Sequence, residues 1–304
     1  MPDKKTHWIV LWAVVILMLA LAGCTSKSVG ETGSRGEDKI KVYTTIYPLY
    51  DFTRAVGGDK VEVVNLIPAG QEPHHWEPTP AVMKDLAKAD LLIYNGAGME
   101  AWLDKIIDAY PNLRTVDSSK GIELIAGDHH HSYDPHIWLD PLNAKQQVRN
   151  ILAALVEADP GSRDYYQKNA QSYLAELDKL DQEYRQALRD VRVRKFIVSH
   201  ASFGYLAKRY GLEQVAVRGM FAEAEPGPKT MKEIVDITRK LGIKHVFYES
   251  LVSPKVSEVI AREAGVDTLC LNPLGALTEE EMSAGKNYLS IMRENLNNLR
   301  LALR

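Results

Sequence analysis

The chain has 304 residues, of which 45% are hydrophobic and 25% charged, and its formal net charge is −3. This composition is ordinary for a globular protein, and a chain of this length can bury the core of one large or two medium domains. The slightly acidic balance argues against nucleic acid as a partner, because a surface that binds nucleic acid is basic.

The amino terminus predicts an export signal. Lys4 and Lys5 precede an uncharged, apolar stretch from Trp8 to Ala22, about 15 residues long. A helix that crosses a bilayer needs about 20 apolar residues, whereas the apolar region of a secretory signal has about 7 to 15. We therefore expect a signal peptide over residues 1–23 rather than a membrane anchor helix.

The next residues predict a lipid anchor. Leu21-Ala22-Gly23-Cys24 resembles a bacterial lipobox, which implies cleavage before Cys24 and acylation of that residue. Residues 24–38 are rich in Ser, Gly and charge, a composition typical of a flexible tether. We expect the protein to be held by lipid on the extracytoplasmic face of a bacterial cell membrane.

Beyond the tether, apolar runs of strand length alternate with segments of helical periodicity. In the first half we predict strands at 41–46, 61–67, 90–94 and 113–116 and helices near 48–56, 81–89, 99–110 and 143–158. This alternation is typical of an α/β unit with a parallel sheet.

The middle of the chain differs from both halves. After Asp159-Pro160-Gly161, residues 162–191 contain no Gly or Pro, and their apolar residues recur three or four apart. We predict one amphipathic helix of about 30 residues, roughly 45 Å long. A coiled-coil arm for a partner is the alternative, but a single apolar stripe between two α/β units favours a rigid strut packed along both.

The second half repeats the alternation of the first. We predict strands at 195–199, 214–217, 245–249 and 267–271 and helices near 203–210, 228–241, 254–264 and 279–301. The expected fold class is α/β, with two lobes joined by one long rigid α-helix, each lobe having a mainly parallel four-stranded sheet flanked by helices. The expected boundaries are 39–160 for the first lobe, 161–192 for the linking helix and 193–304 for the second lobe.

Three histidines lie in predicted loops that we expect at the ligand-binding edge of these sheets. His74 follows the strand at 61–67, His200 follows the strand at 195–199 directly, and His136 precedes the helix near 143. Ligands of open parallel sheets bind beyond the carboxyl ends of the strands. Neutral imidazole is a preferred ligand of zinc, so three such loops predict most of a tetrahedral metal site.

The local settings of these histidines resemble a known family. The four segments are Pro68–Pro80 (PAGQEPHHWEPTP), Asp134–Pro141 (DPHIWLDP), Ser199–Tyr205 (SHASFGY) and Leu271–Leu274 (LNPL). They are similar to the signature regions of the zinc and manganese solute-binding proteins of bacterial ABC transporters, the ZnuA and TroA type. The resemblance implies that a metal ion is held between two lobes and handed to a membrane permease, and we expect a monomer.

Carried over residue by residue, the resemblance makes His74, His136 and His200 the metal ligands. The manganese branch of the family commonly has Glu at the third position, where this chain has His200, so Zn²⁺ is favoured as the transported ion over Mn²⁺. Imidazole also suits zinc, while oxygen ligands suit manganese. The cluster His129-His130-His131 resembles a shortened His-rich loop that would collect zinc; a solvated polar loop is the alternative.

One departure from the family leaves the fourth ligand open. The family often has Asp after the last strand, whereas this chain has Asn272. Water, Asn272, Glu249 and Glu77 are the candidates, with water or a nearby carboxylate preferred. Glu249 and Glu77 are better suited to accept the outer N–H of a ligating histidine, a common arrangement around metals.

Other functions fit the sequence less well. A zinc hydrolase would also use three ligands and a water, with Glu77 as general base, but the chain contains no His-Glu-x-x-His motif. A manganese-binding member of the family and a metal-binding surface adhesin are the remaining alternatives. We expect a zinc carrier with no catalytic residue.

Overall fold

The computed structural model describes residues 39–127, 132–220 and 226–304. Residues 39–304 form one compact unit. The predicted signal peptide, the tether with Cys24, and the cluster His129–His131 lie outside the described residues. None of the helices in the described ranges is both long enough and apolar enough to cross a membrane.

The first half folds around a parallel sheet with the strand order β2-β1-β3-β4. Its strands are β1 (Ile40–Thr44), β2 (Val61–Asn65), β3 (Leu91–Tyr94) and β4 (Thr115–Asp117), and its helices are α2 (Tyr47–Gly57), α3 (Pro80–Leu86), α4 (Leu103–Ala109) and α5 (Pro141–Ala158). In the central pairs, Val42 lies opposite both Val63 and Leu91. Leu91, Leu92 and Ile93 are buried in succession, as expected for a parallel strand covered on both faces.

The second half has the same topology, with the strand order β6-β5-β7-β8. Its strands are β5 (Lys195–Val198), β6 (Glu213–Ala216), β7 (His245–Tyr248) and β8 (Asp267–Cys270), and its helices are α7 (Gly204–Tyr210), α8 (Pro228–Lys240) and α9 (Lys255–Ala264). All strand pairs in both sheets are parallel. The predicted fold class is therefore confirmed.

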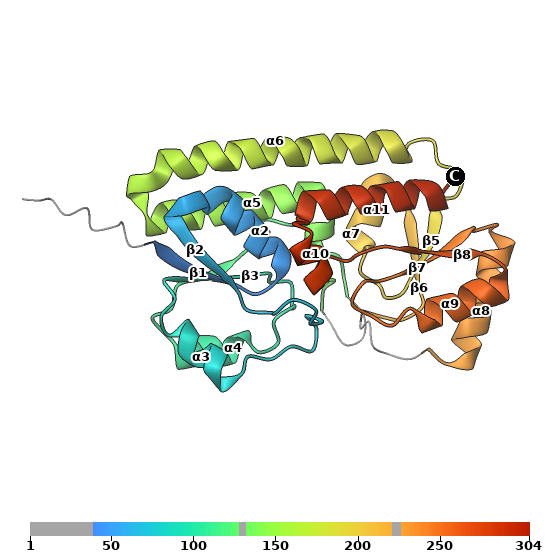
Figure 1. The fold of residues 1–304 in the computed structure, drawn as a ribbon, viewed down its shortest axis with the longest axis horizontal. Helices are drawn as coiled ribbons and strands as arrows, with labels where there is room; N and C mark the ends of the chain where they lie inside the picture. Colours follow the sequence, from blue (N-terminus) through green and yellow to red (C-terminus); the bar gives the residue numbers. More distant parts are fainter. Residues whose placement is uncertain (1–38, 128–131, 221–225) are drawn as a thin grey trace, which may run out of the picture. The chain divides into compact units, whose positions relative to one another are not determined.

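The long helix α6 (Arg163–Leu188) contacts α2, α5 and α7, together with α11 (Tyr288–Ala302) near the carboxyl terminus. Figure 1 shows it running alongside α5 and α11. Its predicted apolar stripe is buried, including Tyr166, Leu177 and Tyr184, within a core cluster that also holds residues of both sheets. The predicted strut is confirmed, with an end at Leu188 rather than Val191.

The predicted helix at 279–301 is wrong in one respect, because it is two helices. Residues Glu279–Ser283 form α10, and α11 starts anew at Tyr288. Between them Gly285 has a φ of 68°, which an α-helix cannot contain. Asn287 then caps α11, its side chain accepting a hydrogen bond from the Ser290 N–H, so the sequence encodes a second helix start.

The predicted helix at 99–110 also begins later than expected, at Leu103. Gly96, Ala97 and Gly98 all have positive φ values, and the chain makes a turn before the helix starts. This turn leads from the end of β3 toward the three histidines, and it places Met99 in the wall of their cavity.

Candidate metal centre

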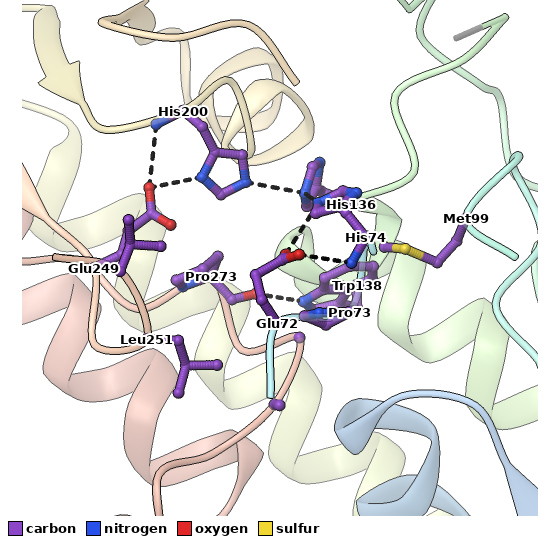
Figure 2. A pocket seen from close by; sticks show the side chains of 13 residues that line it. Glu72, Pro73, His74, Met99, His136, Trp138, His200, Glu249, Leu251 and Pro273 are labelled. Carbon is purple, nitrogen blue, oxygen red and sulfur yellow. Dashed lines mark hydrogen bonds and ion pairs between the residues drawn. The ribbon is translucent and has the colours of Figure 1, made fainter. Parts of the chain in front are cut away.

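The three predicted histidines converge on one point. His74 Nε2 lies 3.0 Å from His136 Nε2, and His200 Nε2 lies 3.3 Å from the same atom. One ring nitrogen from each histidine falls in a group within 4.8 Å of one another (Figure 2). Nitrogens bound to one tetrahedral zinc at about 2.0 to 2.1 Å lie about 3.3 to 3.4 Å apart, so this spacing fits a single zinc ion.

The cavity beside the histidines is small and has mostly apolar walls. Its volume is about 20 Å³, enough for one water-sized ligand. The wall includes Met99, Trp138, Leu251 and Val252. The cavity therefore suits an ion or a single water molecule beside the three imidazoles.

His136 is held by the residue two positions before it. Asp134 Oδ1 accepts a hydrogen bond from the His136 backbone N–H at 2.9 Å and lies 2.8 Å from His136 Nδ1. A hydrogen on Nδ1 leaves Nε2, which faces the other histidines, with a lone pair for a metal. Burial raises the pKa of Asp134 to about 7, against a lowering by the hydrogen bond from the His136 backbone.

His200 has the same support from a residue far away in the sequence. Glu249 Oε1 accepts from the His200 backbone N–H at 3.1 Å and lies 2.7 Å from His200 Nδ1. Glu249 directly follows β7, and His200 lies two residues beyond the end of β5; these strands are neighbours in the second sheet. Both side chains are only 2% exposed. The predicted role of Glu249, accepting the outer N–H of a histidine, agrees with this geometry.

His74 lies in the loop between β2 and α3, and its side chain is 6% exposed. Its backbone N–H donates to Glu72 Oε2 at 2.9 Å, and Glu72 Oε1 lies 3.9 Å from His74 Nε2, the atom nearest His136. Pro73 packs against the backbone of Gly275, where a Cβ atom would come within 2.7 Å of the proline ring. The second half of the chain therefore contacts the His74 loop directly.

Two of the predicted candidates for the fourth ligand do not lie in the cavity wall. Asn272 is buried, but its Nδ2 donates to Glu281 at 2.9 Å and its Oδ1 accepts from the Leu274 N–H at 2.7 Å, so both amide atoms are used in fixing a turn. Glu77 is exposed and does not line the cavity. The carboxylates in the cavity wall are those of Glu72 and Glu249.

The sequence-based reasoning missed Glu72 and Met99. A signal for Glu72 was present, because Glu72-Pro73-His74 repeats the acid-Pro-His order of Asp134-Pro135-His136. Met99 had no such signal, since it reaches the cavity through a turn whose backbone conformation the sequence does not reveal.

Comparisons with known proteins give consistent matches. The family described as "ZnuA: Zinc-uptake complex component A periplasmic" matches residues 42–302. The high-affinity zinc uptake system protein ZnuA of Bacillus subtilis (strain 168) is 37% identical, over 97% of this chain and 98% of that protein.

Two solved structures are similar along most of the chain. The Zn(II)-bound ZnuA-like domain of Streptococcus pneumoniae AdcA has a TM-score of 0.79 and 36% identity, covering 87% of this chain and 99% of that one. The laminin-binding protein Lmb of Streptococcus agalactiae, described as bifunctional with adhesin and metal transporting activity, has a TM-score of 0.80 and 34% identity, covering 87% of this chain and 100% of that one.

Proposed function

Because the chain belongs to the ZnuA family of zinc-uptake components, we propose that it captures Zn²⁺ outside the cytoplasm and delivers it to the membrane permease of an ABC transporter. The observation that carries the proposal is the group of three enclosed imidazole nitrogens at 3.0 and 3.3 Å, two of them in rings backed by carboxylates. A relative described as a high-affinity zinc uptake protein, which matches nearly the whole chain, and a Zn(II)-bound structural neighbour support it.

We assign His74, His136 and His200 as the zinc ligands. Three imidazoles supply borderline-soft nitrogen donors, which suit zinc better than manganese. For the fourth position we propose Glu72, whose Oε1 is 3.9 Å from His74 Nε2. Glu72 lies outside the mutually close group of ligand atoms, so its side chain must move toward the ion on binding. A water molecule in the cavity is the competing fourth ligand.

The ligands also predict how zinc binding depends on pH and on nearby charge. Zinc binds the neutral form of imidazole, so acidification weakens binding by protonating the ligands. The carboxylates of Asp134 and Glu249 add negative charge behind two of the rings and favour a bound cation. We propose no catalytic step, because the family is one of uptake components.

The location of the protein completes the proposal. A signal peptide over residues 1–23, lipidation of Cys24 and a tether over 24–38 would hold the zinc-binding unit at the outer face of the membrane, where a permease can receive the ion. The lobe boundaries at 160 and 192, the accessory role of His129–His131 and a monomeric state remain predictions.

Competitive titration tests the function most directly. We expect the purified protein, freed of metal by a chelator, to bind one Zn²⁺ per chain and to prefer Zn²⁺ over Mn²⁺ in calorimetry. A deletion strain should grow poorly in chelator and recover when zinc, but not manganese, is added. Preference for Mn²⁺, or a stoichiometry of zero, would refute the proposal.

Adhesion is a second candidate function, favoured by the match to a relative described as an adhesin that also transports metal. It would use surface residues away from the histidines. Binding of the purified protein to immobilised laminin tests it, with the His136→Ala variant as a control. Equal adhesion by both proteins would make adhesion independent of zinc, and absence of binding would remove this candidate.

A further inference from the structure

The turn that follows β3 is strained. Gly96, Ala97 and Gly98 have φ values of 76°, 54° and 84°. Glycine adopts such angles readily, but an alanine in the left-handed region costs about 1 kcal/mol or more. Other contacts must therefore hold the turn in this conformation.

Glu100 provides those contacts. Its Oε1 accepts hydrogen bonds from Thr45 Oγ1 at 2.5 Å and from the Asn95 N–H at 2.8 Å, and its Oε2 accepts from the Gly96 N–H at 3.1 Å. One carboxylate thus ties both ends of the turn to each other and to the loop after β1. The position of Asn95 is fixed as a result.

Asn95 in turn reaches the segment that carries His136. It is fully buried, and its Nδ2 donates to the Pro135 carbonyl at 2.9 Å, while its Oδ1 accepts from Gln147 Nε2 at 3.2 Å. The Pro135 carbonyl belongs to the same peptide group as the His136 N–H, which donates to Asp134. The peptide group before the histidine is therefore held at its oxygen by Asn95 and by the Ile137 N–H, at 2.8 Å, and at its nitrogen by Asp134.

We propose that Asn95 is a positioning residue for the zinc ligand His136, and that Glu100 acts by fixing Asn95. The inference rests on the proposed zinc-binding function. Asn95 does not touch the ion; it sets the plane of the Pro135–His136 peptide and thereby the direction in which the His136 ring points. Loss of this contact should distort the metal site without abolishing it.

The test compares two substitutions that make the same chemical change. Asn95→Asp keeps the shape of the side chain but replaces the donor to Pro135 with an oxygen. Asn169→Asp makes the same change in α6, where the Asn169 amide donates to the Val56 carbonyl at 3.1 Å, far along the chain from any histidine ligand. Zinc affinity is measured by competition with a chromophoric chelator, and site geometry by the d–d absorption of bound Co²⁺.

We expect Asn95→Asp to weaken zinc binding about tenfold, as loss of an outer partner of a metal ligand does, and to alter the Co²⁺ spectrum. Asn169→Asp should leave both unchanged. Glu100→Gln, which retains one acceptor oxygen, should alter the Co²⁺ spectrum in the same sense and serves if Asn95→Asp does not fold.

Wild-type affinity and an unchanged Co²⁺ spectrum in folded Asn95→Asp or Glu100→Gln would overturn the inference. Equal weakening by Asn169→Asp would overturn it too, because the effect would then be general destabilisation. A wild-type protein that binds neither Zn²⁺ nor Co²⁺ would instead overturn the proposed function, and this outcome is distinguishable from the others.

Discussion

Two segments of the molecule present a histidine after the same acid-Pro pair, yet they use the acid differently. Glu72 and Asp134 each accept a hydrogen bond from the backbone N–H of the histidine two residues later, at 2.9 Å in both cases. Asp134 also lies 2.8 Å from Nδ1 of its histidine, behind the ring. Glu72 extends past the backbone to within 3.9 Å of Nε2, at the front. Within this motif, the carboxylate of Asp134 therefore lies behind the ring of its histidine, and that of Glu72 lies on the side of Nε2.

The two segments also differ in their attachment to the second half. The His136 segment is held there by Tyr205, which donates to the Asp134 carbonyl at 2.8 Å, and by Tyr288, which donates to the Trp138 carbonyl at 2.6 Å. Trp138 Nε1 donates to the Pro273 carbonyl at 2.8 Å. The His74 loop has a backbone bond from Gly70 to Leu277 at 2.8 Å and the packing of Pro73 on Gly275. The His136 segment therefore has more hydrogen bonds to the second half than the His74 loop has, and we expect it to hold its position more firmly in the absence of zinc.

The largest expected decrease in zinc affinity comes from removing a histidine whose ring is held by a carboxylate. His136→Ala and His200→Ala should each weaken zinc binding by more than about a hundredfold, beyond the roughly 10- to 100-fold cost of losing an outer partner. We expect His74→Ala to cost less, because the His74 loop has fewer hydrogen bonds to the second half than the His136 segment has, so more of its binding energy would go into fixing the loop. Calorimetry on folded variants checks the ranking, and a His74→Ala variant as weak as the other two would break the comparison.

Next come the carboxylates behind the rings. Asp134→Asn and Glu249→Gln should each lower zinc affinity about 10- to 100-fold, because the amide keeps an acceptor for the N–H groups but removes the negative charge. Circular dichroism and thermal melting serve as controls for folding. If either variant binds zinc like the wild type, its carboxylate has no part in tuning the site.

The acid in front of the metal should matter less and in a different way. Glu72→Gln should weaken zinc binding by up to about tenfold, since water can take the fourth position. Glu72→Asp should behave like Glu72→Gln, because the shorter side chain withdraws the carboxylate from Nε2. The exposed Glu77→Gln variant is the matched control and should bind as the wild type does. Full affinity in Glu72→Gln would contradict the assignment of the Glu72 carboxylate as the fourth ligand.

The smallest expected effect is on how the free energy of unfolding changes with pH, and it depends on Glu100. Burial raises the pKa of Glu100 from near 4.5 to about 7, against lowering by its hydrogen bonds. The folded protein therefore binds this proton more tightly than the unfolded chain does, so this group's contribution to stability falls as the pH rises from about 4.5 to about 7.

The Glu100→Gln substitution removes this pH-dependent contribution to stability, because the amide does not titrate. The free energy of unfolding of the wild type in chelator should fall by about 1 kcal/mol more than that of the variant between pH 5 and pH 8, because the folded wild type holds the Glu100 proton more tightly than the unfolded chain does. Urea denaturation at the two pH values measures the difference. Parallel pH profiles would show that Glu100 titrates as an ordinary carboxyl group does.

The sequence by itself determined the alternating elements, the long helix, the three histidines and the family, since each depends on neighbouring residues: apolar periodicity, caps and short motifs. It also contained the signals for the break between α10 and α11, namely Gly285, which adopts a positive φ in the structure, and the capping residue Asn287, although the apolar periodicity suggested one continuous helix.

Only the tertiary structure decided which acids meet the histidines. Glu249 contacts His200, 49 positions away in the sequence, because β5 and β7 are adjacent strands. Asn272 also follows a strand, but its amide is hydrogen-bonded to Glu281 and to the Leu274 N–H instead. Glu72 and Asp134 share one motif but differ in reach. The pairing of Glu249 with His200 depends on the distance between segments remote in sequence, which local patterns do not encode, whereas Glu72 and Asp134 lie in local motifs and only the direction of each side chain had to come from the structure.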